Sequence, residues 1–378
     1  MADPLQRRPH ILFLFSDTGG GHRSATEAII EALQLEFDDL FTTQMVDIFV
    51  DIAPKPFSYV PKWYPYMVRF PEVWGASYYL SNGSRRARLI VESAYPYVRR
   101  MIHRVINQSP ADMVVSVHPL ANDPFLHALG KNHPPFITVV TDLVTTHALW
   151  YHKDVDLCLV PTEAARERGL LTGLRPEQLK VVGLPVADRF CQPIGDKNVM
   201  RDQLGWPHDR LVVLLVGGGD GMGPIEKTAN AIASANLPIT LVIIAGRNEE
   251  LRERLAATQW PMPTFVHGFV HDMPEFMQAS DILVTKAGPG TISEALNAGL
   301  PMILYSRLPG QEDGNVDYVI SEGVGMWAPK TSYIVSALRA WITHPQQRDL
   351  AGEACCQAAR PEAAREIARI LAHRLGVN

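Results

Sequence analysis

The sequence lacks any apolar run long enough to cross a bilayer. Its longest runs, at 11–15, 211–216 and 239–245, are far shorter than the roughly 18–20 residues that a membrane-spanning helix needs. The polar N-terminus, Met1 to Pro9, has no signal-peptide pattern. Of the four cysteines, two are adjacent and none has metal-ligand spacing. These absences favour a protein of a reducing compartment without a transmembrane helix.

An excess of positive charge is also missing. The chain has 35 Lys and Arg against 40 Asp and Glu, a net charge of −5, whereas a general nucleic-acid binder normally carries a basic domain or stripe. Charged residues make up 20% of the chain and apolar residues 47%, which excludes wholesale disorder. The length of 378 residues predicts two domains, because one domain usually takes about 100–200 residues.

Short β-branched runs alternate with segments of helical period, which is typical of α/β proteins with parallel sheets. The series restarts beyond Pro185. We therefore predict two doubly wound domains facing a cleft, residues 1–187 and 188–350, and a C-terminal helix over 351–378 that can cross back to the first domain. The expected strands are 10–16, 44–48, 111–117, 136–141 and 156–160, then 210–216, 239–245, 264–267, 282–285, 302–305 and 325–327.

One segment is rich in aromatic and basic residues. Residues 57–97 hold eleven of the 31 aromatic residues, and residues 55–104 hold nine Lys or Arg against two Glu. We call residues 55–104 the aromatic-basic segment. Its composition suits a surface that contacts anionic lipid headgroups; the alternative is a loop whose aromatic side chains fill a core. Five prolines between 54 and 71 exclude a regular amphipathic helix in its first part.

A glycine-rich turn, Asp17 to His22, follows the first expected strand. Ser24 and Glu27 have the spacing of a capping box and predict the start of the next helix there. Such a turn brings the backbone close to a ligand at the carboxyl ends of the strands. His22 could take a proton from a hydroxyl, because the unperturbed pKa of imidazole is about 6.5. The alternative is that His22 only hydrogen-bonds the turn.

Two further glycine turns, Gly217–Gly223 and Lys286–Gly290, also follow a strand and precede a helix. Both place backbone N–H groups where a diphosphate can bind. Neither is a P-loop or a dinucleotide fingerprint, so an NAD enzyme is disfavoured. Thr291 and Glu294 have capping-box spacing, but Glu294 could equally accept hydrogen bonds from ribose hydroxyls. The polar run Pro309–Asn315 suits sugar hydroxyls, although a solvated helix start is the commoner case.

These motifs resemble those of the monogalactosyldiacylglycerol (MGDG) synthases and the related bacterial diacylglycerol glucosyltransferases. The resemblance follows the order of the chain along nearly its whole length. It implies the GT-B fold of glycosyltransferase family 28, with the acceptor on the N-terminal domain and the nucleotide sugar on the C-terminal domain. The residues that carry it are Ser16–Ala25, Thr141–Leu143, His147, Trp150–Lys153, Gly183–Val186, Gly217–Glu226, Gly268–Val270, Thr285–Thr291 and Pro309–Asn315.

On the acceptor side, the resemblance makes His22 the base that deprotonates the hydroxyl of diacylglycerol. Gly21 and Trp150 would lie on the same side. For the membrane contact, the aromatic-basic segment supplies the candidates Trp63, Arg85, Arg86 and Arg88.

On the donor side, the resemblance implies that Glu294 holds the ribose of a UDP-sugar. Gln311 and Glu312 would contact the hexose. The remaining donor residues are Gly218, Phe269 and Val270 for the uracil and sugar-phosphate part, and Lys286, Gly288, Pro289, Gly290 and Thr291 for the diphosphate.

The reaction that the resemblance implies is inverting: UDP-galactose and 1,2-diacylglycerol give monogalactosyldiacylglycerol. UDP-glucose is the alternative donor. The sequences of Lys286–Thr291 and Gly310–Val316 resemble those of the plant-type enzymes and therefore favour galactose. Positive helix ends and Lys286 can stabilise the departing UDP without a metal. We therefore expect no metal and no other cofactor in the donor site.

The expected setting is a bacterial protein, without a transit peptide, that is peripheral on the cytoplasmic face of the cell membrane. It would bind an anionic lipid surface and no nucleic acid. Two other classes stay open. A sugar-nucleotide epimerase shares the two-domain fold but has no use for the aromatic-basic segment, and a non-catalytic lipid-binding protein has no use for the donor loops.

Overall fold

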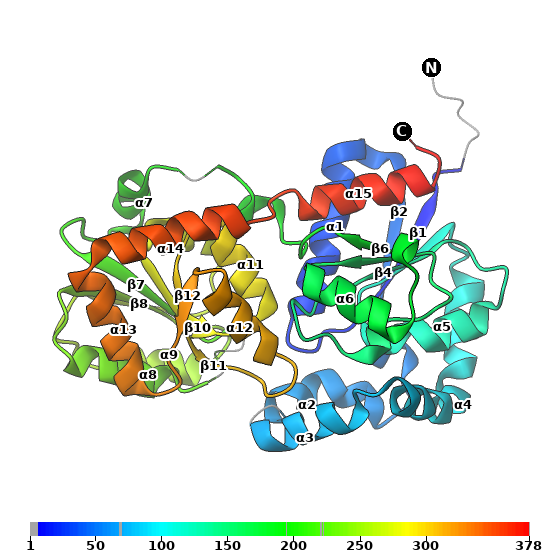
Figure 1. The fold of residues 1–378 in the computed structure, drawn as a ribbon, viewed down its shortest axis with the longest axis horizontal. Helices are drawn as coiled ribbons and strands as arrows, with labels where there is room; N and C mark the ends of the chain where they lie inside the picture. The colour runs from blue at the N-terminus through cyan, green and yellow to red at the C-terminus, as the bar shows by residue number, and fades with distance from the viewer. Residues whose placement is uncertain (1–6, 68–69, 194, 220, 222, 378) are drawn as a thin grey trace. The chain divides into compact units, whose positions relative to one another are not determined.

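The computed structural model describes residues 7–67, 70–193, 195–219, 221 and 223–377. These residues form two compact units. Unit 1 comprises the chain up to Asp188 together with 309–311 and 362–378, and unit 2 comprises 189–308 and 312–361. Each unit has one sheet of six parallel strands with helices on both faces, so the predicted pair of doubly wound α/β units is confirmed (Figure 1).

The sheet of unit 1 has the strand order β2-β1-β3-β4-β5-β6. Its four inner strands are buried on both faces, which explains why they read as continuous apolar runs, whereas the edge strands β2 and β6 are more exposed. Along β1, Ile11 and Phe13 belong to one core cluster and Leu12 and Leu14 to another, because successive side chains point to opposite faces. The strands are β1 (His10–Phe15), β2 (Thr42–Asp47), β3 (Met113–Ser116), β4 (Phe136–Val139), β5 (Leu157–Val160) and β6 (Leu179–Val181).

Helices cover both faces of this sheet. The helix α15 (Ala363–Arg374) packs against α1 (Gly21–Phe37), and Figure 1 shows the two, in red and blue, side by side. Arg369 and Arg365 of α15 both form ion pairs with Glu36 of α1. The remaining helices of unit 1 are α2 (Val60–Met67), α3 (Pro71–Ser81), α4 (Ser84–Gln108), α5 (Asn122–Leu129) and α6 (Glu163–Thr172).

The sheet of unit 2 has the order β12-β11-β10-β7-β8-β9. It comprises β7 (Leu211–Val216), β8 (Ile239–Ile244), β9 (Thr264–His267), β10 (Ile282–Lys286), β11 (Met302–Ser306) and β12 (Gly325–Trp327). Its helices are α7 (Lys197–Leu204), α8 (Ile225–Ser234), α9 (Glu249–Ala256), α10 (Met273–Ala279), α11 (Pro289–Asn297), α12 (Asp313–Ser321), α13 (Thr331–Thr343) and α14 (Pro345–Ala358).

Two local predictions are wrong, and one strand was missed. The prolines do not exclude helix from the first part of the aromatic-basic segment. Pro61 and Pro71 stand in the first turns of α2 and α3, where a missing N–H costs no helical hydrogen bond. Pro65 lies in the second turn of the short helix α2. The tail is two helices, α14 and α15, rather than one. The strand β6 was not predicted, since three residues are too few to show the hydrophobic pattern of a strand.

Candidate active site

The first glycine turn leads directly into α1. Gly19 and Gly20 have positive φ angles of 71° and 77°, a conformation that glycine adopts without strain. Gly20 is the residue before the helix, and no side chain caps it. The predicted capping box of Ser24 and Glu27 is therefore wrong, because the glycines start the helix three residues earlier. This start makes His22 the second residue of α1.

His22 lies where three neighbouring strands end. It follows β1, while His118 follows β3 and Thr141 follows β4, and these strands are adjacent in the sheet. Nδ1 of His22 is 2.8 Å from the hydroxyl oxygen of Thr141. The rings of His22 and His118 have their centroids 4.6 Å apart in an edge-to-face arrangement. The carboxyl edge of this sheet, where open α/β sheets bind ligands, therefore carries two imidazoles and a hydroxyl.

Burial keeps His22 neutral. It lowers the pKa of the imidazole to about 4, and the carbonyl of Val117 opposes this shift only in part. At neutral pH, His22 therefore has an unprotonated nitrogen that can take a proton.

The predicted acceptor-side residues lie beside His22. Gly21 is exposed, with open space around its Cα. Trp150 is fully buried, with its ring centroid 6.0 Å from that of His22. Its indole N–H donates to Asp142 Oδ2 at 2.6 Å. Trp150 is thus a buried neighbour of the imidazole, fixed by its hydrogen bond to Asp142, rather than a side chain exposed to a ligand.

Gln311 belongs to the short segment 309–311 of unit 1. Its Nε2 donates to Oδ1 of Asp142 at 3.1 Å. Its neighbour in the sequence, Glu312, belongs to unit 2. The structure therefore groups the two residues predicted for the hexose with different units.

In unit 2, Lys286 connects the second and third glycine turns. A Cβ atom at Gly218 would lie 3.4 Å from Cε of Lys286, and one at Gly288 would lie 3.1 Å from its Nζ. Nζ of Lys286 forms an ion pair with Oε1 of Glu312 at 3.2 Å. The other oxygen of Glu312 accepts from the backbone N–H of Leu308 at 2.7 Å. The structure thus brings together Gly218, Lys286, Gly288 and Glu312.

The helix α11 begins at Pro289, with Gly288 as its N-cap residue. The first N–H groups of a helix have no partner within it and attract anions. A Cβ atom at Gly290 would meet nothing within 4 Å, so there is space next to this helix end. Thr291 is inside the helix and caps nothing. The predicted capping box of Thr291 and Glu294 is therefore wrong, and capping no longer explains Glu294.

Phe269 and Val270 follow β9. Phe269 is exposed, and the guanidinium of Arg247 lies 4.6 Å from the centre of its ring. A Cβ atom at Gly219 would lie 3.5 Å from Nη1 of Arg247. Val270 is half-buried. Sequence reasoning did not single out Arg247, which reaches the second glycine turn from the loop after β8.

Glu294 has an unusual environment for a carboxylate. Burial raises its pKa to about 7, and the positive charge of Arg189 opposes the shift. In the part of the chain that the structure describes, no hydrogen bond or ion pair to the side chain of Glu294 is found. Its folded pKa lies above the ordinary value, so the carboxylate reduces stability increasingly as the pH rises from about 4.5 to 7.

If Glu294 holds the ribose of a nucleotide sugar, as the resemblance implies, Glu294→Gln should raise the KM for that substrate about tenfold or more at pH 8, because an amide would replace the carboxylate that accepts from the ribose. The same change should leave the melting temperature equal to wild type at pH 5 and higher at pH 8, since it removes a buried charge. Steady-state kinetics and thermal melts check both expectations. An unchanged donor KM with a raised melting temperature would remove Glu294 from the donor site.

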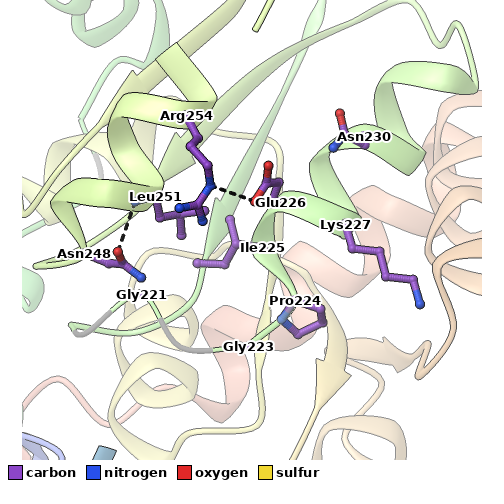
Figure 2. A pocket seen from close by; sticks show the side chains of 10 residues that line it. All are labelled: Gly221, Gly223, Pro224, Ile225, Glu226, Lys227, Asn230, Asn248, Leu251 and Arg254. Atoms are coloured by element: carbon purple, nitrogen blue, oxygen red, sulfur yellow. Dashed lines mark hydrogen bonds and ion pairs between the residues drawn. The ribbon is translucent and has the colours of Figure 1, made fainter. Parts of the chain in front are cut away.

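A pocket of about 490 Å³ lies at the start of α8 (Figure 2). Glu226 and Arg254 form an ion pair at 3.2 Å on its wall, and Asn248 accepts from the backbone N–H of Leu251. The ten residues that line it include none of the predicted donor residues. Among the described residues of the second glycine turn, Gly221 and Gly223 line it.

The aromatic-basic segment exposes much of its apolar surface. Trp63 is 45% exposed and Tyr97 is 74% exposed. Tyr64 of α2 and Trp74 of α3 meet edge to face with ring centroids 5.6 Å apart, and Figure 1 shows α2, α3 and α4 following one another in unit 1. Arg86 is exposed, whereas the side chains of Arg85 and Arg88 lie outside the described residues. The exposed apolar side chains also include Phe57, Tyr59, Tyr66, Phe70, Val73, Tyr79, Leu80 and Leu89.

The exposed side chains do not fill a core, but others of the segment do: Val91 and Ile102 are buried, and Tyr95 packs against a core cluster of unit 1. Tyr78 is buried as well. It is 8% exposed and donates its hydroxyl to the carbonyl of Thr145 at 3.1 Å. Among the described helices, none is both long enough and apolar enough to pass through a membrane. The described residues also include no group of three or more His, Cys, Asp or Glu that could hold a metal ion.

Comparison with known families gives two matches. A family model described as monogalactosyldiacylglycerol (MGDG) synthase matches residues 22–186, and a model of the glycosyltransferase family 28 C-terminal domain matches residues 212–368. The probable chloroplastic monogalactosyldiacylglycerol synthase of Nicotiana tabacum is 39% identical over 94% of this chain and 69% of its own length. Monogalactosyldiacylglycerol synthase 1 of Arabidopsis thaliana is 37% identical over 96% and 70%.

Solved structures with a similar fold are more distant in sequence. MurG of Acinetobacter baumannii matches with a TM-score of 0.61 at 15% identity, over 97% of this chain and 99% of its own. A putative UDP-N-acetylglucosamine 2-epimerase of Listeria monocytogenes matches with a TM-score of 0.64 at 14% identity, over 99% and 98%. At such low identity these matches show the fold alone, and with the two parallel sheets they confirm the predicted GT-B fold.

Proposed function

The chain belongs to the monogalactosyldiacylglycerol synthase family, and from this premise we propose that it moves galactose from UDP-galactose to 1,2-diacylglycerol with inversion at the anomeric carbon. It is a glycosyltransferase whose substrates are a sugar nucleotide and a lipid. The observation that carries the proposal is His22, a neutral imidazole held by Thr141 at the carboxyl edge of the sheet of unit 1.

The acceptor half of the reaction is a proton transfer. His22 takes the proton of the free hydroxyl of diacylglycerol as the oxygen attacks the anomeric carbon of the sugar. Thr141 fixes the orientation of the ring, because its hydroxyl occupies Nδ1. The buried Trp150 keeps the ring from turning away.

The donor half is the departure of UDP, which leaves with negative charge. Gly290, next to open space, stands in the first turn of α11, and the ammonium of Lys286 lies beside Gly288, the N-cap residue of that helix. Both the helix N-terminus and the ammonium are positive. We propose that these groups stabilise the leaving diphosphate, with Glu294 on the ribose and Phe269 on the uracil side. A positive helix end together with a lysine makes a metal unnecessary, so we expect transfer to continue in the presence of a chelator.

One assay tests the function. The protein is incubated with diacylglycerol liposomes and either radiolabelled UDP-galactose or radiolabelled UDP-glucose. We expect label from UDP-galactose in the lipid phase as a β-galactosyl diacylglycerol. Label from UDP-glucose alone would make the protein a glucosyltransferase, and an epimerase would interconvert sugar nucleotides in the aqueous phase without labelling lipid. A non-catalytic lipid-binding protein would do neither.

We further propose that the aromatic-basic segment attaches the enzyme to an anionic membrane surface, as a peripheral protein on the cytoplasmic face of the cell membrane. Exposed aromatic rings suit the interfacial layer, and each basic residue near the surface adds about 1 kcal/mol. Trp63 and Arg86 are exposed in this segment. Since the net charge of the whole chain is −5, attraction to anionic lipid has to come from a local concentration of cations.

We expect replacement of Arg85, Arg86 and Arg88 by glutamine to reduce co-sedimentation with phosphatidylglycerol vesicles at low salt several-fold. Salt should weaken the binding of the wild type in the same way, because exposed charges are screened over about 10 Å at 0.1 M. The vesicle binding that remains at high salt should decrease when Trp63 is replaced by alanine.

A matched control removes three exposed cations elsewhere, with Lys131, Arg339 and Arg360 replaced by glutamine. This control has the same net charge as the first variant and should still co-sediment. Equal binding of both triple variants at low salt would show that the Arg85–Arg88 cluster does not contact the membrane.

A further inference from the structure

A second buried histidine accompanies His22. His118 comes two residues after β3, whose Ser116 pairs with Leu14 of β1. It is 6% exposed, and its ring meets that of His22 edge to face at 4.6 Å. Phe49 packs edge to face on it at 5.9 Å. Its place beside the base, rather than in the core of the sheet, calls for an explanation beyond packing.

The hydrogen bonds of His118 determine which of its nitrogens carries the proton. Nδ1 accepts from the backbone N–H of Leu120 at 3.3 Å, so the proton of the neutral ring is on Nε2. Burial, together with the neighbouring His22, holds the pKa of His118 well below its usual range. Within the described part of the chain, Nε2 has no hydrogen-bond partner. His118 therefore presents a neutral N–H donor, held in place by the backbone.

The acceptor lipid has a matching need. Diacylglycerol has one hydroxyl and two ester groups, and the ester carbonyls can only accept hydrogen bonds. A site that directs the hydroxyl towards His22 must hold the glycerol by an ester, with a donor close to the base. A neutral donor serves this purpose without bringing a charge next to the imidazole that has to take a proton.

We propose that Nε2–H of His118 donates to an ester carbonyl of the bound diacylglycerol and so holds the free hydroxyl at His22. The inference rests on the proposed function and extends it to the recognition of the acceptor. The alternative is that His118 only caps the turn that begins at Pro119, through its bond with Leu120.

The test compares diacylglycerol with a dialkylglycerol, in which ether links replace the esters and no carbonyl remains. His118→Phe keeps a flat ring and removes the donor. We expect it to raise the apparent KM for diacylglycerol about tenfold, the effect of one lost hydrogen bond, and to leave the KM for dialkylglycerol unchanged. His118→Gln has a donor of similar reach and should recover part of the preference for the ester.

His147 provides a matched control. Its Nδ1 accepts from the backbone N–H of Leu149 at 3.2 Å, so it caps a turn as His118 does, but its ring packs on Tyr78. His147→Phe should lower the melting temperature as His118→Phe does and keep the wild-type preference for ester over ether. The donor KM should be unchanged in both variants, because the donor loops belong to unit 2.

The outcomes separate the inference from the function on which it rests. If His118→Phe weakens the use of both lipids equally, or of neither, the ester contact is wrong while the enzyme still makes galactolipid. If the wild type transfers no galactose to diacylglycerol, the proposed function itself fails, whatever His118 does.

Discussion

Replacing His22 by alanine is expected to lower kcat for galactose transfer about 10²- to 10⁴-fold, the range that a positioned general base contributes. The binding of UDP should stay at the wild-type affinity, because the donor loops belong to unit 2 and His22 to unit 1. Single-turnover transfer to diacylglycerol and calorimetry with UDP measure the two quantities separately. Near wild-type turnover in the variant would show that His22 is not the base.

Thr141→Val gives a matched second variant. It keeps the shape of the side chain and removes the hydroxyl that lies 2.8 Å from Nδ1 of His22. We expect a smaller fall in kcat than for His22→Ala, because the base is still present and only its orientation is lost. An equally large fall would mean that Thr141 takes part in the chemistry itself.

The buried histidines also predict how stability depends on pH. Burial lowers the pKa of both His22 and His147 to about 4, whereas in the unfolded chain a histidine takes up its proton near pH 6.5. Between these values the unfolded state binds more protons than the folded state. The free energy of unfolding therefore falls as the pH drops from about 6.5 to 4, by roughly 1.4 kcal/mol per pH unit for each proton.

Urea unfolding at pH 7 and pH 5 measures this loss. His22→Ala should have a shallower dependence on pH than the wild type, because one of the titrating groups is gone. The same slope in both proteins would mean that the imidazole of His22 is not buried as a neutral group.

The fold was predictable from the sequence because most of its strands are buried on both faces. Runs such as 211–216 and 239–244 consist almost wholly of apolar residues, and each corresponds to a strand. The helix starts were less predictable. Two capping boxes fit the spacing rule at Ser24 and Thr291, but the helices begin earlier, at Gly21 and Pro289. At both helix starts the N-cap residue is a glycine, and no side chain caps the helix.

The candidate site was predictable only where it is local in the sequence. The glycine turns and His22 stand in contiguous motifs. The partner of His22 is Thr141, 119 residues away, and His118 reaches the same edge from a third strand. No spacing rule connects positions so far apart, since only the order of the strands in the sheet brings them together. Arg247 was missed for the same reason.

The ion pair between Lys286 and Glu312 gives the second large prediction. Glu312 is almost fully buried, and both of its oxygens are engaged, by Lys286 and by the N–H of Leu308. Lys286→Met removes the positive charge next to Gly288 and leaves a buried carboxylate without its partner. We expect kcat to fall about 10²- to 10³-fold and the free energy of unfolding to fall by on the order of 3 kcal/mol.

The double variant Lys286→Met with Glu312→Gln separates these two effects. It has no unpaired buried charge, and the amide oxygen of glutamine can still accept from Leu308, so stability should return close to that of wild type. Activity should stay low, because the departing diphosphate still lacks the ammonium. Glu312→Gln alone measures what the carboxylate itself contributes. If the double variant regained turnover together with stability, Lys286 would serve only to neutralise Glu312, and the stabilisation of UDP would have to come from the N-terminus of α11 alone.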